Sequence, residues 1–406
     1  MTTIHDTFSK SYAEARQKFL NAAQQAGLQV ESHIHPEKGR DGEELAMDVV
    51  REGPADAKHI LLISSACHGV EGYCGSGVQI DALRNSEWHQ AVAQSGVAVV
   101  YVHALNPHGF SHVRRVTHEN VDLNRNFHDF SKPLPDNPAY KEVQHFLLPD
   151  VWPPNEANLQ TTMQFIAAHG MAKLQAAVSQ GQHHDPKVLF LGGQGPTWSN
   201  LTIRKVLRQQ GGTAQKLAWI DLHTGLGPSG VGERIYAGAN DTAAIERARQ
   251  WWGNITSIYD GSSTSSFLTG LMWMSVQDEC PHAEYTGIAL EYGTLPMEDM
   301  LMALRADHWL YIHPEASNDL KQSVKAQIFN AFYTDTDEWR AQIITQAREA
   351  MFIALADQLN AAPIQHIGKL FVLWRPQAEK VREADEDRMP GPRDVKVLKY
   401  SSRGGQ

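Results

Sequence analysis

The chain has 406 residues, of which 42% are hydrophobic and 20% are charged, and its formal net charge is −10. This balance is typical of a globular protein with a large core, and the acidic charge argues against nucleic acid or anionic membranes as partners. Three cysteines are too few for a disulfide framework. Because no secretory signal pattern and no membrane-spanning apolar run are visible, we expect a cytoplasmic protein with no membrane partner.

The spacing of apolar residues predicts alternating helices and strands. In chain order, we expect a helix over residues 8–27, strands over 44–50 and 59–65, a helix ending near 84, a strand over 96–105, a polar loop over 106–127, a proline-rich connection over 133–156, a helix over 157–180, a strand over 187–191, a helix over 199–210, a strand over 216–222, a helix over 242–253, a strand over 287–290, and helices over 315–333 and 336–360. This order indicates an α/β sandwich with a mixed or mostly parallel sheet and C-terminal helices. We expect one catalytic domain over residues 1–360 and a partly disordered extension over 361–406.

Polar clusters follow four of the predicted strands. They are His68 with Glu71, the segment from Arg114 and Arg115 to Asn124 and Arg125, Asp221 with His223, and Glu291 with its neighbours. In open α/β sheets, ligands bind beyond the carboxyl ends of the strands. We therefore expect the four clusters to converge on one cleft.

Two of these clusters contain the side chains of a catalytic metal site. His68, Glu71 and His223 supply two imidazoles and one carboxylate, which is a set that holds catalytic zinc together with a water molecule. Zinc lowers the pKa of such a water to about 7. A hydrolase then needs a carboxylate that moves the water's proton to the leaving amine, and Glu291 is the candidate.

The arginines of the loop over 106–127 suit a substrate that carries a carboxylate. A guanidinium binds a carboxylate in a bidentate way and stabilises a developing oxyanion. Arg125 and the pair Arg114 and Arg115 are the candidates for these two tasks.

Taken together, the motifs resemble those of the zinc carboxypeptidase superfamily, the clan of carboxypeptidase A. The motifs are HGVEGYCGSG at 68–77, NPHGF at 106–110, VDLNRNF at 121–127, DLHTGLG at 221–227 and the pair Leu290-Glu291. They are similar, more narrowly, to a bacterial branch of unestablished function, and the spacing of the arginine loop is similar to that of aspartoacylase and succinylglutamate desuccinylase. The resemblance covers about residues 8–360. It implies a three-layer sandwich around a central mixed, mostly parallel sheet.

The resemblance also implies a role for each matching residue. His68, Glu71 and His223 match the ligands of Zn²⁺, Asp122 matches the acid that orients the first ligand histidine, Asn124 and Arg125 match the pair that binds the terminal carboxylate, and Glu291 matches the general base and acid. The arginine that polarises the scissile carbonyl is assigned to Arg115 first and to Arg114 second. The reason is that the segment before Asn124 is shorter than in the digestive enzymes.

Two features depart from the digestive carboxypeptidases. An insertion at about residues 130–185 has no counterpart there, and we expect it to cap the cleft. The substrate-binding tyrosine has two candidates, Tyr259 and Tyr285. In addition, Asp221 either supports His223, which shares its face of the strand, or is a plain buried hydrogen-bonding group.

These residues predict a zinc-dependent hydrolase that cleaves an amide bond next to a free carboxylate. The first expectation is a carboxypeptidase that acts on small peptides, and the alternative is a deacylase of N-acyl amino acids. A non-catalytic protein that binds a metal or a peptide is a third possibility, against which the presence of Glu291 argues. The expected partner is a small molecule or short peptide with a free carboxylate.

Overall fold

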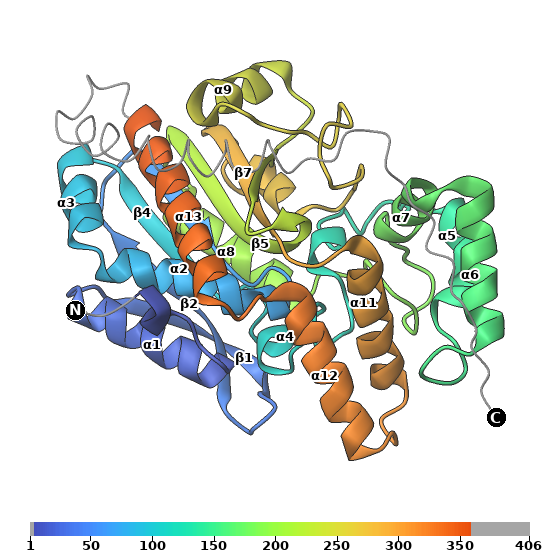
Figure 1. Cartoon of the computed structure of the whole chain (residues 1–406). Helices are drawn as coiled ribbons and strands as arrows, with labels where there is room; N and C mark the ends of the chain where they lie inside the picture. Colours follow the sequence, from blue (N-terminus) through green and yellow to red (C-terminus); the bar gives the residue numbers. More distant parts are fainter. Residues whose placement is uncertain (1–3, 359–406) are drawn as a thin grey trace. The chain divides into compact units, whose positions relative to one another are not determined.

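A seven-stranded sheet organises the chain in the computed structural model, which describes residues 4–358 (Figure 1). The strands are β1 (Val30–Lys38), β2 (Glu44–Glu52), β3 (His59–Ser64), β4 (Ala98–His103), β5 (Lys216–Ser229), β6 (Gly232–Tyr236) and β7 (Glu284–Gly293). They lie in the order β1-β2-β4-β3-β5-β7-β6. The four central strands β4, β3, β5 and β7 are parallel, whereas β1, β2 and β6 join through antiparallel pairs.

Helices cover both faces of this sheet, because the central strands are apolar on both sides. In β3, Leu61 and Ile63 pack into one core, whereas Ile60 and Leu62 pack into a second core on the opposite face. The first core is covered by α1 (Tyr12–Gln25), α2 (Gly72–Arg84) and α13 (Asp337–Gln358), and the second by α8 (Trp198–Gly211) and α10 (Ser275–Glu279). The predicted three-layer α/β sandwich with a mixed sheet is therefore confirmed.

The remaining short helices and turns connect these layers. They are η1 (Ile4–Thr7), η2 (Gly69–Glu71), α3 (Ser86–Ser95), α4 (Pro107–Ser111), η3 (Leu123–Arg125), α9 (Thr242–Trp252), η4 (Met272–Met274), α11 (Met297–Ile312) and α12 (Asn318–Phe332). Several helices of the fold begin at a side chain that caps the first turn. Ser11 accepts a hydrogen bond from the backbone N–H of Glu14, and Asn85 caps α3 in the same way.

The predicted insertion contains the helices α5 (Pro138–Leu147), α6 (Glu156–His169) and α7 (Met171–Ser179), which share a small apolar core. The single helix expected over 157–180 is two helices, because Gly170 adopts a φ of +84° between them. Arg305 of α11 donates to the carbonyl oxygens of Leu147 and Phe146 at 2.6 and 2.9 Å. The insertion therefore lies against α11, as Figure 1 shows.

Several predicted boundaries were wrong. Residues 187–191 do not form a strand: Leu191 makes isolated bridges, and Leu189 and Phe190 pack onto the core of the insertion. The strands β1 and β6 and the helices α3, α5 and α11 were not predicted, and β5 and β7 are longer than expected. The predicted C-terminal extension, residues 361–406, lies outside the described residues.

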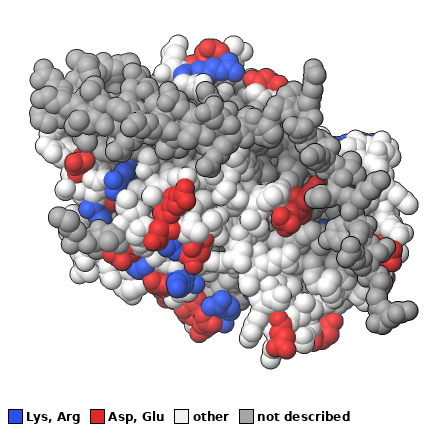
Figure 2. Space-filling model, in the orientation of Figure 1, with Lys and Arg blue, Asp and Glu red and all other residues white. Residues whose placement is uncertain are grey.

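Within residues 4–358, no helix has both the length and the apolar character that crossing a lipid bilayer requires. Acidic and basic side chains lie next to one another at the lower left and at the top of the face in Figure 2, and much of the described surface at its centre carries neither.

Candidate metal centre and substrate cavity

The turn after β3 brings His68 and Glu71 together. His68 has an extended backbone, and Glu71 follows in the 3₁₀ turn η2. A Cβ atom at Gly69 would lie 2.1 Å from the carbonyl carbon of Gly109, so only glycine allows the turn to approach α4 this closely. The spacing of the two side chains is therefore fixed by a tight backbone contact.

Strands β5 and β7 place His223 beside Glu291. The two residues are direct partners in the register of this parallel pair, so their side chains leave the same face of the sheet. Both residues lie inside their strands, whereas the sequence pattern placed them just beyond the strand ends.

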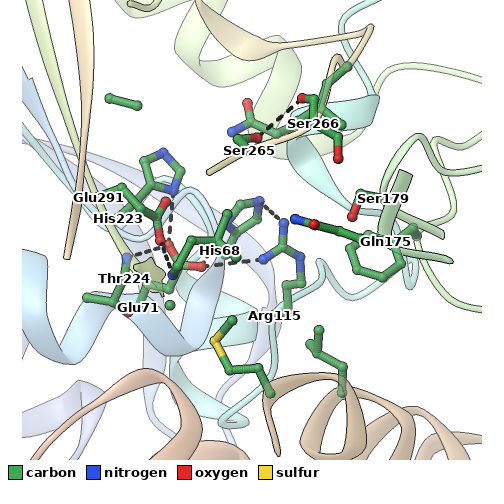
Figure 3. Close-up of a pocket in the computed structure, with 18 of the residues that line it drawn as sticks. His68, Glu71, Arg115, Gln175, Ser179, His223, Thr224, Ser265, Ser266 and Glu291 are labelled. Atoms are coloured by element: carbon green, nitrogen blue, oxygen red, sulfur yellow. Dashed lines mark hydrogen bonds and ion pairs between the residues drawn. The ribbon is translucent and has the colours of Figure 1, made fainter. Parts of the chain in front are cut away.

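The side chains of His68, Glu71 and His223 meet at one point. Glu71 Oε1 lies 2.8 Å from His68 Nδ1, and Glu71 Oε2 lies 2.9 Å from His223 Nδ1. All three side chains are buried, and one donor atom from each lies within 4.8 Å of the other two. Figure 3 shows the two imidazoles on either side of the carboxylate.

An aspartate lies beside the outer nitrogen of each histidine. His223 Nε2 lies 2.6 Å from Asp221 Oδ2, and His68 Nε2 lies 3.3 Å from Asp122 Oδ1. Asp221 in turn accepts a hydrogen bond from Ser64 Oγ at 2.5 Å. Carboxylates in this position set the tautomer and orientation of metal-binding histidines. The contact between Asp221 and His223 therefore favours the expectation that Asp221 orients His223.

The charges of this cluster stabilise one another. Burial raises the pKa of Glu71, but the imidazoles of His68 and His223 outweigh burial and hold that pKa below its ordinary value. Burial lowers the pKa of His223, but Asp221 and Glu71 outweigh it and hold that pKa well above the ordinary value. The carboxylates beside His223 thus favour its protonated form.

Arg115 faces the same cluster. Its Nε donates to Asp122 at 2.9 Å, its Nη1 donates to Glu71 at 3.4 Å, and its Nη2 lies 2.8 Å from His68 Nε2. Burial lowers the pKa of Arg115, but Asp122 and Glu71 outweigh burial and raise it. Of the two candidate arginines, Arg115 is the one that the structure places at the cavity.

Arg114 points away from the cavity. Its guanidinium donates to Asp307 of α11 at 3.0 Å and to Asn120 at 3.0 Å, and it lies 4.2 Å from the ring centroid of Tyr311. Arg114, expected as a substrate-binding residue, therefore does not line the cavity, because Asp307 binds its guanidinium, whereas Arg115 does line it.

Glu291 lies buried beside the cluster of His68, Glu71 and His223. Its Oε1 accepts a hydrogen bond from the backbone N–H of Leu226 at 3.0 Å. Burial and the negative charge of Glu71 raise the pKa of Glu291 to about 7. A carboxyl group with such a pKa can accept and return a proton near neutral pH.

Asn124 and Arg125 also line the cavity. Arg125 Nε donates to the carbonyl oxygen of Ser179 at 2.7 Å, and its Nη1 donates to that of Asn124 at 2.9 Å. The carboxylate nearest to it is Asp122, at 3.9 Å, and burial lowers the pKa of Arg125 to about 10. A buried guanidinium that is held mainly by neutral carbonyls favours the approach of an anion.

The cavity beside these residues has a volume of about 140 Å³ and is mostly apolar. Its walls come from β5, β6 and β7, from the segment before η4, and from α11 and α12; they include Leu226, Ile235, Ile258, Leu268, Leu271, Trp273, Met297, Met300, Leu301, Leu304 and Phe332. Among the described lining residues, Arg115 and Arg125 are the two arginines, and no lysine is present.

The insertion and a serine-rich loop supply polar lining groups that the sequence did not reveal. Gln175 and Ser179 of α7 lie on one side of the cavity in Figure 3, and Ser265 and Ser266 lie on another. Gln175 Nε2 donates to the carbonyl oxygen of Thr264 at 3.1 Å and so joins the two segments. The expected cap thus reaches the cavity through α7. Exposed serine and glutamine are common in any loop, so these residues carried no sequence signal.

The two candidate tyrosines lie elsewhere. Tyr259 donates to the carbonyl oxygen of Gly238 at 2.8 Å, and the hydroxyl of Tyr285 is buried without a partner among the described residues. Neither residue lines the cavity. The structure therefore brings no predicted tyrosine to the site.

Residues with a positive φ surround the site. Ala66, Ala104, Val113, Asn120 and Phe190 have φ values between 52° and 64° although none is glycine. Ala66 lies two residues before His68, Val113 lies next to Arg114, Asn120 lies two residues before Asp122, and Phe190 lines the cavity. Such backbone strain concentrates at functional sites, where the surrounding structure holds it in place.

The residues fit a zinc ion. Two imidazole nitrogens and a carboxylate oxygen converge, an aspartate lies beside each outer nitrogen, and a cavity adjoins the three side chains. A second group, Cys67 with Asp221 and His223, fits less well, because burial raises the pKa of Cys67 and keeps the thiol protonated.

Two solved structures are similar to this chain at low sequence identity. A metallo-carboxypeptidase from Burkholderia cenocepacia is 11% identical with a TM-score of 0.34, and the match covers 80% of this chain and 69% of that one. Bovine thrombin-activatable fibrinolysis inhibitor, solved with a tick carboxypeptidase inhibitor, is 12% identical with a TM-score of 0.39, and the match covers 80% and 98%. No curated protein matches the sequence. The profile of a family described as "Protein of unknown function (DUF2817)" matches residues 8–346, and the chain therefore belongs to that family.

Proposed function

We propose that this protein is a zinc-dependent hydrolase that cleaves an amide bond next to a free carboxylate, and that its substrates are short peptides with an apolar C-terminal residue. The observation that carries the proposal is the pairing of His223 with Glu291 on adjacent strands. This pairing places the buried carboxylate of Glu291 directly beside the three proposed ligands without making it one of them.

Each residue then has a task that follows from its place. His68, Glu71 and His223 would hold the ion, which would supply Lewis acidity and lower the pKa of a bound water molecule. Glu291 accepts the proton of the attacking water and passes it to the leaving amine. Arg115 lies at the cavity wall, where its charge stabilises negative charge that develops on the carbonyl oxygen.

Arg125 is the group that binds the substrate's carboxylate, with Asn124 beside it. Asn124 Oδ1 accepts a hydrogen bond from the backbone N–H of Met272 at 3.0 Å, so its amide nitrogen remains for a substrate oxygen. Gly270 approaches the carbonyl carbon of Arg125 so closely that a Cβ would lie 2.7 Å from it. Arg125, the proposed carboxylate-binding residue, thus lies next to the apolar segment before η4.

The walls of the cavity favour an apolar substrate. Arg115 is already bound to Asp122 and Glu71, which leaves Arg125 as the single arginine of the described lining without a direct carboxylate hydrogen bond. A substrate with a second carboxylate, such as an N-acyl aspartate, would bury that charge against leucine, isoleucine and methionine. At about 140 Å³, the cavity is smaller than typical ligand sites of about 300–1,000 Å³, which favours a small substrate.

A deacylase of N-acyl amino acids is the second candidate, and the cap supports it. Helix α7 and the loop around Ser265 narrow the cavity on the side away from the sheet, which suits a short acyl group as well as a peptide residue. In this case too, the acyl group and side chain are expected to be apolar.

The test is mass-spectrometric profiling of the zinc-loaded protein against four matched substrate sets. These are di- and tripeptides ending in leucine or phenylalanine, the same peptides ending in aspartate, their C-terminal amides, and N-acetyl and N-octanoyl leucine. Glu291→Gln serves as the inactive control. Loss of C-terminal leucine or phenylalanine supports the carboxypeptidase, and release of leucine only from acylated substrates supports the deacylase. Equal cleavage of amides and free acids contradicts the carboxylate anchor, and no turnover with bound zinc supports a metal- or peptide-binding protein.

A further inference from the structure

A buried ion cluster joins the C-terminal helices to the turn that carries two of the metal-binding residues. Asp307 of α11 accepts hydrogen bonds from Arg114 Nε at 3.0 Å and from Lys325 Nζ of α12 at 2.6 Å. Asp307 and Arg114 are buried, and one carboxylate therefore compensates two cations. None of these three residues lines the cavity.

The cluster holds a strained backbone position. Lys325 Nζ also donates to the carbonyl oxygen of Val113 at 3.2 Å. Val113 has a φ of +52°, a conformation that a β-branched residue adopts only when its surroundings enforce it. The ion cluster thus contacts Val113 at its carbonyl and the next residue, Arg114, at its side chain.

The segment that follows Val113 contacts the turn between the two metal-binding residues. The carbonyl oxygens of Arg114 and Arg115 accept hydrogen bonds from the backbone N–H groups of Val70 and Gly69 at 2.8 and 3.0 Å. Val70 and Gly69 are the two residues that separate His68 from Glu71. A displacement of Val113–Arg115 would therefore change the distance between two ligands and also move the side chain of Arg115.

We propose that Asp307 and Lys325 are positioning residues that hold the Val113–Arg115 segment in its strained form and thereby keep His68, Glu71 and Arg115 in metal-binding geometry. This inference rests on the proposed function, because it takes His68 and Glu71 as ligands. It adds an ionic connection from α11 and α12 to the centre, beside the apolar side chains that these helices contribute to the cavity wall.

The experiment compares Asp307→Asn with a matched control. Asp81 of α2 is a buried carboxylate that binds Arg348 of α13 at 2.7 and 2.8 Å, so Asp81→Asn breaks a comparable ion pair away from the centre. Zinc affinity is measured by competition with a chromophoric chelator, and the spectrum of the Co²⁺ form reports ligand geometry. Both variants are used at a temperature at which circular dichroism shows them folded.

We expect Asp307→Asn to weaken zinc binding on the order of tenfold and to change the Co²⁺ spectrum, whereas Asp81→Asn changes neither. Adding Val113→Gly to Asp307→Asn should restore much of the affinity, because glycine adopts a positive φ without steric cost. A folded Asp307→Asn variant with wild-type affinity and spectrum would overturn the inference.

A second variant keeps the inference testable if Asp307→Asn does not fold. Lys325→Met retains the pair of Asp307 with Arg114 but removes the contact with Val113, and we expect a several-fold loss of zinc affinity that Val113→Gly again reverses. Unchanged affinity of Lys325→Met would refute the positioning role. Wild-type protein that binds no zinc would overturn the proposed function and this inference together, whereas wild-type binding with unaffected variants would overturn the inference alone.

Discussion

Replacement of Glu291 by glutamine should stabilise the metal-free protein while abolishing its activity. Burial and the charge of Glu71 raise the pKa of Glu291 from 4.5 to about 7 in the folded protein. Each unit of pKa difference between the folded and unfolded states corresponds to about 1.4 kcal/mol. The ionised carboxylate therefore costs the metal-free fold about 3 kcal/mol once the pH exceeds 7.

The sign of this effect sets its pH dependence. A raised carboxyl pKa means that the folded state favours the protonated form, so the cost is absent below pH 4.5, grows between pH 4.5 and 7, and is complete above pH 7. Glutamine mimics the neutral form at every pH. The variant should match the wild type at pH 4.5 and exceed it at pH 8.

The assay is thermal unfolding with a chelator present, at pH 4.5, 6 and 8. For a chain of this size, 3 kcal/mol corresponds to roughly 3–6 °C in Tm at pH 8. Glu37→Gln is the control, because Glu37 is an exposed strand residue and its replacement should change Tm by less than about 1 °C. Equal Tm values for Glu291→Gln and wild type at pH 8 would refute the electrostatic description of the site. Retained turnover would remove Glu291 from its catalytic role.

Three further outcomes are expected. Zinc should bind at about one equivalent per chain and raise Tm, and it should bind more tightly as pH rises because His223 must lose a proton. The double variant His68→Ala with His223→Ala should lose the zinc. Elemental analysis that finds full zinc in this variant would contradict the ligand assignment. Arg125→Ala should lower kcat/KM about tenfold to a hundredfold for substrates with a free carboxylate but little for their amides, and an equal loss for both would show that it does not bind the carboxylate. Gly69→Ala should destabilise the protein by about 1–3 kcal/mol in chemical denaturation, because its Cβ would collide with Gly109, and wild-type stability would show that the turn can move freely.

Local patterns predicted most of the sheet and the composition of the site. The apolar runs of β3, β4 and β5 are long and buried on both faces, so their periodicity is unambiguous. The pair His68 and Glu71 lies in one turn, so its convergence follows from short-range geometry. The edge strands β1 and β6 were missed because one is largely exposed and the other has only five residues.

The errors arose where tertiary contacts decide the outcome. Residues 187–191 are as apolar as a buried strand, but Leu189 and Phe190 pack into the core of the insertion, and the segment joins no strand of the described sheet. The choice between Arg114 and Arg115 depended on Asp307, which is far away in the sequence and captures Arg114. The local spacing of apolar and polar residues indicates neither the packing of this segment nor the ion pair between Arg114 and Asp307.

The register of β5 against β7 has a consequence for how this chain can vary over evolutionary time. His223 and Glu291 face each other because two strands run in step, and adjacent residues of a strand point to opposite faces. Gain or loss of a single residue before either position would turn one of the two side chains to the far side of the sheet. The helices α5, α6 and α7 of the insertion are not paired in register with a strand of the sheet, so a change in their length would not turn a site residue to the opposite face. We therefore expect indels to gather in residues 130–185 and to be purged from the two strands.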